Sequence, residues 1–205
     1  MNTQSGRSMV EMLGVLAIIG VLSVGAIAGY SKAMMKYKLN KQAEQISWLL
    51  NVMYRYKSEF GKNPPSMSFV PYFIKLGEIP EDMITDNETL HDVFNSKIML
   101  QTNDCSTGRC YQTIIRYFIS SSEKFETCQN VFTVAKAFNE HLDASGVYRS
   151  ISANPEYGNF YYGSRYCTNG KKCIKDMTQE QIYNQCRFCT EGSSGCTIFF
   201  TFRID

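Results

Sequence analysis

"GRSMVEMLGVLAIIGVLSVG", residues 6–25, combines a long apolar run with a carboxylate, Glu11, near its start. Residues 12–30 contain no charged side chain. At a rise of about 1.5 Å per residue, a helix over residues 9–30 spans the hydrocarbon core of a bilayer, which is roughly 30 Å thick. A charge at the centre of that core costs roughly 2.5–3.5 kcal/mol. The sequence therefore predicts that something offsets the cost of Glu11 or makes use of it.

The helical pattern continues beyond the apolar run. Apolar residues recur at spacings of three and four, which predicts one buried helix face made of Leu39, Ala43, Ile46, Leu50 and Met53. Four lysines mark the end of the apolar run: Lys32, Lys36, Lys38 and Lys41. Because no proline precedes Pro64, we expect one helix over residues 7–60, with a transmembrane half (9–30) and an amphipathic half (31–60). Residues 61–205 then form a globular head.

A cleaved secretory signal is the alternative for the apolar run, since "SVGAIAGYS" (residues 23–31) offers small residues for a cut. A signal peptide, however, does not continue in register into a helix that packs on a domain. Four glycines lie in the run: Gly14, Gly20, Gly25 and Gly29. The spacing of the last two allows a second helix to approach closely, although glycine is also simply common in membrane helices.

Composition is that of a folded protein, with 20% charged and 44% hydrophobic residues in 205. The net charge of +2 is too balanced to indicate nucleic-acid binding. An even set of cysteines lies in the later half: Cys105, Cys110, Cys128, Cys167, Cys173, Cys186, Cys189 and Cys196. Such a set predicts disulfides in an oxidising compartment, and short loops favour Cys105–Cys110 and Cys167–Cys173. Zinc at Cys186-x-x-Cys189 is the alternative, but a zinc ribbon needs a second such knuckle.

The head has recognisable elements of an α+β fold. Strands are expected over residues 110–121 and 196–205, and a helix over 121–146 with Cys128, Phe132, Ala135 and Phe138 on one face. Residues 147–195 are expected to form loops and short strands. Their aromatic stretch "ANPEYGNFYYGSRYC" (residues 153–167) either packs the edge of the sheet or forms a contact surface for a neighbour or a host ligand.

Motifs of catalysis do not occur in the sequence. There is no G-x-S-x-G, no P-loop and no H-E-x-x-H. We therefore expect no enzyme activity, no cofactor and no metal.

Gly6, Glu11 after four intervening residues, and the unbroken apolar run together resemble a type IV prepilin. The resemblance implies a leader over residues 1–6, which a prepilin peptidase removes by cutting between Gly6 and Arg7. It also implies that the new amino terminus, which the family methylates, meets Glu11 of a neighbouring subunit. A buried carboxylate paired with a cation is tolerable, so this contact would offset the cost of Glu11.

The segments "LGEIPEDM" (residues 76–83) and "TLHDVFNSKIML" (89–100) resemble the type IVb pilins. That resemblance implies the type IV pilin fold, in which a long amino-terminal helix packs on an antiparallel sheet in an α/β roll. It also implies a disulfide-stapled head in which Cys128 pairs with Cys186 or Cys189, and Cys196 with the one left over.

The function implied is that of a structural subunit of a type IV pilus, supporting adhesion, aggregation or the transfer of DNA or other macromolecules. Its partners are copies of itself and other pilins, the prepilin peptidase, the inner-membrane assembly machinery and, before assembly, membrane lipid. The precursor is expected to cross the bacterial inner membrane once, with a periplasmic head that becomes extracellular in the pilus. The lysines after the apolar run alone favour a cytoplasmic head, but the cysteines and the prepilin pattern favour the opposite.

Two alternatives belong to other functional classes. A pseudopilin of a type II secretion system shares the amino-terminal pattern but acts as a piston. A membrane-anchored or secreted disulfide-rich binding domain would not assemble at all.

Overall fold

The computed structural model describes residues 5–60, 65–106, 109–119, 124–151, 154–191 and 195–204, and their side chains except those of residues 5–8, 104–106, 109–110, 150–151 and 154–155. The chain divides into two compact units, Met1–Lys38 and Leu39–Asp205. The boundary falls inside the first helix, so the second half of that helix belongs to the same unit as the head.

Helix α1 (Ser5–Tyr56) confirms the expectation of one long helix, and it ends in a turn over residues 57–60 rather than running through them. Beyond Leu39 its apolar stripe is buried, with Ile46 2% exposed and Leu50 and Met53 fully covered. Burying an aliphatic side chain of this size contributes about 1.5–3 kcal/mol. The spacing of three and four therefore identified the face that attaches this half of α1 to the head.

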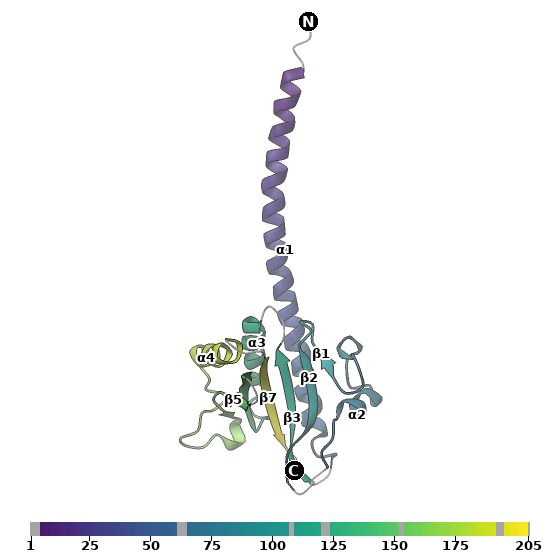
Figure 1. Cartoon of the computed structure of the whole chain (residues 1–205), viewed down its shortest axis with the longest axis vertical. Helices are drawn as coiled ribbons and strands as arrows, with labels where there is room; N and C mark the ends of the chain where they lie inside the picture. Colours follow the sequence, from purple (N-terminus) through teal and green to yellow (C-terminus); the bar gives the residue numbers. More distant parts are fainter. Residues whose placement is uncertain are drawn as a thin grey trace. The chain divides into compact units, whose positions relative to one another are not determined.

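One antiparallel sheet forms the head, with strand order β1-β2-β3-β7-β4-β5 and with β6 paired to β4. Figure 1 shows the carboxy-terminal strand β7 beside β3 in the middle of the sheet. The strands are β1 (Leu90–His91), β2 (Lys97–Ser106), β3 (Arg109–Ile119), β4 (Ala144–Ile151), β5 (Asn154–Tyr157), β6 (Tyr161–Tyr162) and β7 (Gly195–Arg203). The strands expected near residues 110–121 and 196–205 correspond to β3 and β7.

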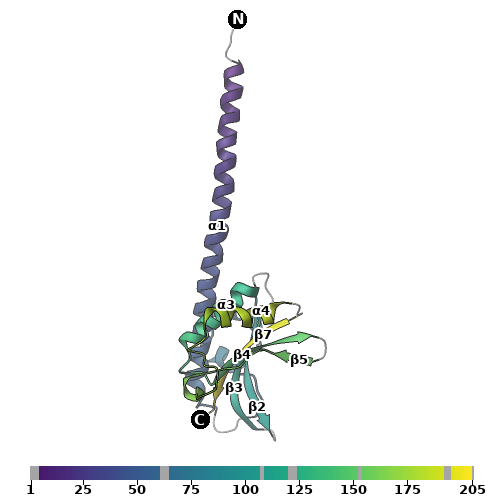
Figure 2. The same cartoon turned by 90° about the vertical axis from the view of Figure 1, so that its left-hand side faces the viewer.

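Alternation along the strands gives the sheet two different faces. On the inner face Ile115, Tyr117, Ile198 and Phe200 join one core with α1 beyond Leu39 and with α3. Figure 2 shows α3 and this part of α1 on the same side of the sheet. The alternate residues point to the outer face, which none of the helices of the described head residues covers.

The end of the second helix and the segment after it differ from the sequence-based expectation. Helix α3 (Lys124–Ala137) is shorter than residues 121–146, and β4 begins at Ala144. Cys128, Phe132 and Ala135 are nevertheless fully buried on one helix face, as expected, whereas Phe138 lies just beyond the end of the helix and is half-buried. The backbone of residues 144–150 instead pairs with β7 as a strand, and this pairing satisfies its buried backbone groups.

A further helix, α4 (Gln179–Thr190), lies where only loops and short strands were expected. Thr178 caps it: its hydroxyl accepts from the backbone N–H of Gln181, and the Gln181 side chain accepts from the backbone N–H of Thr178. This capping box satisfies two helix-end donors. Shorter elements complete the head, namely α2 (Val70–Lys75), η1 (Glu81–Met83) and η2 (Ser164–Tyr166).

A buried polar network joins α1 to the sheet. The Asp92 carboxylate is only 6% exposed, and it accepts hydrogen bonds from Gln42 Nε2 (2.9 Å) and from the Tyr117 hydroxyl. Its other oxygen accepts from the backbone N–H groups of Phe94 (2.9 Å) and Ser96 (2.7 Å). Four donors thus offset the cost of removing this carboxylate from water.

The same network extends to two neighbouring elements. Asn130 Nδ2 on α3 donates to Gln42 Oε1 (2.8 Å) and to the Leu39 carbonyl (2.7 Å). Gln45 Oε1 accepts from the backbone N–H of Val93 (3.0 Å). Gln42 and Gln45, three residues apart on one face of α1, therefore hold the turn between β1 and β2 and fix the position of the helix along the sheet.

Three disulfides staple the described part of the head. Cys128–Cys186 joins α3 to α4, Cys189–Cys196 joins α4 to β7, and Cys167–Cys173 closes a short loop. The resemblance implied that Cys128 pairs with Cys186 or Cys189 and that Cys196 pairs with the other, and the structure has the first of these alternatives. Cys167–Cys173 is the pairing expected from its short loop. The side chains of Cys105 and Cys110 lie outside the described ones, although their backbones are opposite each other between β2 and β3.

Ionisation of Tyr117 should lower the stability of the head at alkaline pH. Burial and then the adjacent Asp92 carboxylate raise the pKa of Tyr117 well above its usual value of about 10. The native state thus holds this proton more tightly than the unfolded chain. The stabilisation is complete below pH ~10 and is lost as the pH rises through the native-state pKa. The free energy of unfolding, measured with urea in detergent micelles, should fall by about 1.4 kcal/mol per pH unit above pH ~10 because of this one group.

Tyr117→Phe should remove that share of the slope, whereas Tyr111→Phe, at a side chain that is 43% exposed, should leave the slope unchanged. Tyr56, whose pKa is raised by its hydrogen bond to Glu78, and Tyr161, whose pKa is raised by burial, contribute to the slope that remains. An identical slope for wild type and Tyr117→Phe would contradict the role of this tyrosine.

The disulfides should differ in their contribution to stability. Cys128–Cys186 closes a loop of sequence separation 58, and Cys167–Cys173 one of 6. In the chain-entropy model, replacing the first pair by serines costs about 4 kcal/mol of unfolding free energy and replacing the second about 2 kcal/mol. Denaturant unfolding of the two double variants measures both values, and equal losses would contradict the loop-length argument.

Candidate functional site: the exposed surface of the amino-terminal helix

The amino-terminal half of α1 exposes apolar side chains on every side. Within it, an 18-residue window reaches a mean hydropathy of 2.4 with none of the window buried. The exposed fractions run from 53% to 76% among Met9, Val10, Met12, Leu13, Val15, Leu16, Ile18, Ile19, Val21, Leu22, Val24, Ile27 and Tyr30. This helix is long and apolar enough to cross a membrane, and it can be stable only where lipid or other protein replaces water.

The glycines give this surface places for close packing. A Cβ added at Gly14, Gly20, Gly25 or Gly29 would have nothing within 4 Å in this unit of the chain. Gly25 and Gly29 lie one turn apart on the same face, which allows a neighbouring helix backbone to approach there. The structure thus leaves these positions accessible, and their role in helix packing stays a prediction.

Glu11 places a carboxylate on the same surface. Its side chain is exposed and lines a shallow hollow together with Met12, Val15 and Leu16, on the face formed by residues one turn apart. At the other end of the apolar run, Lys32 and Lys36 are also exposed and mark the return to a polar surface. The side chains of Gly6 and Arg7, where the cut is expected, lie outside the described ones, although their backbone belongs to α1.

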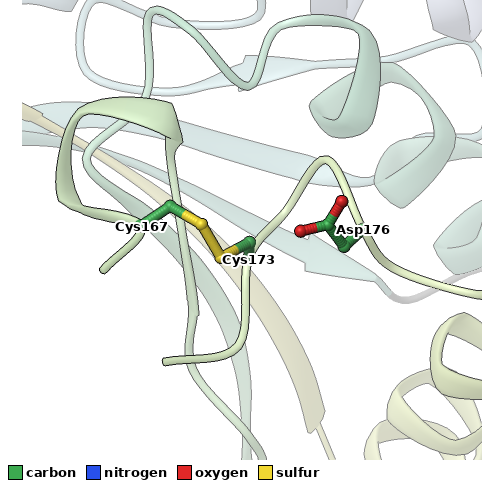
Figure 3. A group of neighbouring side chains, drawn as sticks. All are labelled: Cys167, Cys173 and Asp176. Atoms are coloured by element: carbon green, nitrogen blue, oxygen red, sulfur yellow. A yellow bond between two sulfur atoms is a disulfide. The ribbon is translucent and has the colours of Figure 1, made fainter. Parts of the chain in front are cut away.

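The cysteines that resembled metal ligands are used in disulfides. Figure 3 shows Cys167, Cys173 and Asp176, whose possible ligand atoms all lie within 4.8 Å of one another. Cys167 and Cys173 are bonded to each other, so neither sulfur is a thiolate that could bind zinc. Cys186 and Cys189, the zinc alternative considered from the sequence, are bonded to Cys128 and Cys196. Both groups therefore act as staples in this structure.

A groove of about 600 Å³ lies on the outer face of the head sheet. Five aromatic side chains line it: Tyr148, Tyr157, Phe160, Tyr162 and Phe199. Polar side chains line it as well, namely Asn103, Gln112, Arg116 and Thr201. The aromatic stretch of residues 153–167 was considered a possible contact surface from the sequence. The residues from β2, β3 and β7 were not, because only strand pairing brings them together.

No protein-family model matches this chain, and no curated protein is similar to it. The exposed apolar helix with its carboxylate, the stapled α+β head and the groove on the outer face of the sheet are therefore the features that a function for this protein must explain.

Proposed function

We propose that this chain is a structural subunit of a type IV pilin-like filament, nearest the type IVb group, and that it assembles through its amino-terminal helix. The observation that carries the proposal is the apolar surface of residues 9–30, exposed on every side and bearing Glu11 near its start. Lipid can cover such a helix in a precursor, and neighbouring helices can cover it in a filament. A plain membrane anchor has no use for a carboxylate at this depth.

The head supports the same proposal. A long helix whose second half packs on an antiparallel sheet, with disulfides that tie α4 to α3 and to the terminal strand, has the general organisation that the resemblance implies. A staple between helices and the last strand keeps the end of the chain in place without a folding partner. Such a head remains folded while its helix exchanges lipid for protein.

Glu11 has a specific task in this mechanism. In a filament the carboxylate leaves the membrane interface and becomes buried between helices, where only a cation and hydrogen bonds offset its desolvation. Cleavage after Gly6 creates a new α-amine at Arg7, four residues before Glu11. The amine of one subunit pairs with Glu11 of the next, so the same cut that matures the chain also completes the contact.

The mature amino terminus distinguishes this proposal from its rivals. Intact-mass spectrometry of the membrane fraction should find that residues 1–6 are missing. A cut near Gly29 would instead indicate a secreted domain, and an uncut chain a plain anchor. Gly6→Val, which places a branched side chain where a peptidase must approach closely, should leave the precursor uncut. Normal accumulation of cleaved protein from Gly6→Val would contradict the assignment of the cut.

Glu11→Ala should abolish assembly without affecting membrane insertion or cleavage, because alanine suits a bilayer better than glutamate. Leaving one buried charge without its partner costs about 3–5 kcal/mol. The sheared filament fraction should therefore fall at least about tenfold, while cleaved subunits accumulate in the membrane. Glu11→Gln, which keeps hydrogen bonding, should be intermediate. Glu140→Ala, at an exposed carboxylate of the head, is the matched control and should assemble normally. Normal filaments from Glu11→Ala would refute the role of the carboxylate.

A further inference from the structure

The groove on the outer face of the sheet has a continuous aromatic wall. The rings of Tyr157 and Phe160 are stacked with centroids 6.0 Å apart, and that of Phe160 lies 5.3 Å from the ring of Phe199. Tyr148 contacts both ends of this row, at 5.7 Å from Tyr157 and 6.4 Å from Phe199. Tyr157 is 57% exposed and Phe160 43% exposed. Rings that pack on one another yet remain this exposed offer flat apolar faces to a ligand.

Phe199 forms the base of this wall because of a glycine on the neighbouring strand. Gly146 lies directly opposite Phe199 between β4 and β7. A Cβ at Gly146 would be 2.7 Å from Phe199 Cζ, so the ring lies against bare backbone. Phe199 is accordingly only 5% exposed, and it holds the more exposed Phe160 in place.

Arg116 brings a positive charge to the groove. It lies on β3, opposite Phe199 of β7, and it is the one charged side chain that the described residues contribute to the lining. Its Nε is buried without a hydrogen-bond partner in the described part of the chain. A buried guanidinium N–H without a partner is unfavourable, and a carboxylate is the acceptor that matches its planar geometry.

Two amides line the same groove four residues before the arginine along β3, about 13 Å away along the strand. Asn103 of β2 and Gln112 of β3 are opposite each other in register, and Asn103 Nδ2 is 3.5 Å from Gln112 Oε1. A contact of that length is weak, so both side chains keep donors and acceptors for a ligand. A neighbouring hollow shares Gln112 and Tyr162 with the groove and adds Lys171 and Arg203 against one carboxylate, Asp143. The surroundings are thus more positive than negative.

We propose that this groove binds a short oligosaccharide that carries a carboxylate. The C–H faces of the sugar rings pack on Phe160 and Tyr157, the carboxylate pairs with Arg116, and the sugar hydroxyls bond with Asn103 and Gln112. A volume of about 600 Å³ lies within the usual range for small-ligand sites. The aromatic faces suit sugar rings, the amides suit sugar hydroxyls, and the single cation suits one carboxylate at one end of the ligand.

Charge decides between this ligand and a nucleic-acid strand. Aromatic rings also stack on bases, but strand-binding grooves follow the phosphate backbone with a row of cations. Here one cation lines the groove in the described part of the chain, and the adjoining hollow adds Lys171 and Arg203 beside the carboxylate of Asp143, so the cations form no continuous row along the groove. A second copy of this chain is a less suitable occupant, because the polar side chains and the buried Nε of Arg116 would then need a matching carboxylate on a protein surface.

The test uses the unassembled full-length chain in detergent micelles, so its outcome does not depend on the proposed filament. The probes are a hyaluronan tetrasaccharide, which carries glucuronate, and the neutral N-acetylglucosamine tetrasaccharide as its matched control. Sialyllactose tests the other common source of a sugar carboxylate. Calorimetric or ligand-observed NMR titration should show that at least one acidic sugar binds at least tenfold more tightly than the neutral one.

Variants assign the binding to the groove. Arg116→Gln should reduce the affinity for the acidic sugar at least tenfold and leave the affinity for the neutral one unchanged, while Phe160→Ala should weaken both. Arg187→Gln on α4, where the arginine is exposed and pairs with Glu191, is the matched control and should bind as wild type. Phe160→Ala changes a half-exposed ring, so it keeps the test valid if Arg116→Gln does not fold.

Three outcomes would overturn the proposal. The first is equal binding of the acidic and neutral sugars, or no binding of either. The second is an oligothymidylate that binds more tightly than both acidic sugars and loses affinity in Arg116→Gln. The third is a change of oligomeric state in Phe160→Ala with sugar binding unaffected, which would make the groove a contact between copies.

Discussion

The apolar surface of residues 9–30 is the constraint on which this protein depends. Its backbone satisfies its own hydrogen bonds as a helix, but its side chains have no cover within their unit of the chain. Water is an unfavourable solvent for such a surface, whereas lipid and other apolar helices are both suitable. Either environment can therefore cover this helix. In the proposed filament the carboxylate of Glu11 distinguishes the two, because lipid does not solvate a charge whereas a protein interface can supply a cation.

The position of the head along α1 depends on a different kind of contact. The apolar stripe of Ile46, Leu50 and Met53 contributes burial, but aliphatic contacts are not directional and define a position along the sheet less sharply than hydrogen bonds do. Gln42 and Gln45 do not allow α1 to shift along the sheet, since their amides must meet Asp92 and the backbone of Val93. A shift would leave the buried Asp92 carboxylate with one donor fewer and the backbone N–H of Val93 without its acceptor, at a cost of several kcal/mol. Polar contacts inside the core thus select one position of α1 along the sheet, and apolar contacts supply most of the free energy that holds α1 on the head.

The sequence predicted the elements that local pattern determines and missed those that depend on distant pairing. Apolar residues at spacings of three and four predicted α1 and its buried stripe, and runs of β-branched and aromatic residues predicted β3 and β7. The roles of Gln42 and Gln45 were not predicted, because nothing local in the sequence shows that Asp92 lies opposite them. Helix α3 ends at Ala137, a turn follows over residues 138–141, and pairing with β7 begins at Ala144. The position of β7 in the sheet is not visible in the sequence. In α4, Ile182, Cys186 and Cys189 have helical spacing, but the two cysteines were interpreted as staples or, alternatively, as zinc ligands.

The two faces of the head sheet allow assembly and ligand binding to be separate properties. The second half of α1 covers the inner face, whereas the groove with Arg116 and Phe160 opens on the outer face of the same sheet. Contacts made through α1 therefore use surface that the groove does not share. The groove draws its residues from six strands, β2 to β7, and from the turn after β5. The staples at Cys128, Cys189 and Cys196 lie in the core on the inner side of that sheet. Because α1 and the disulfides support the sheet on its inner face, the aromatic wall and the arginine on the outer face can keep fixed positions. A ligand then binds without the entropy cost of ordering these side chains.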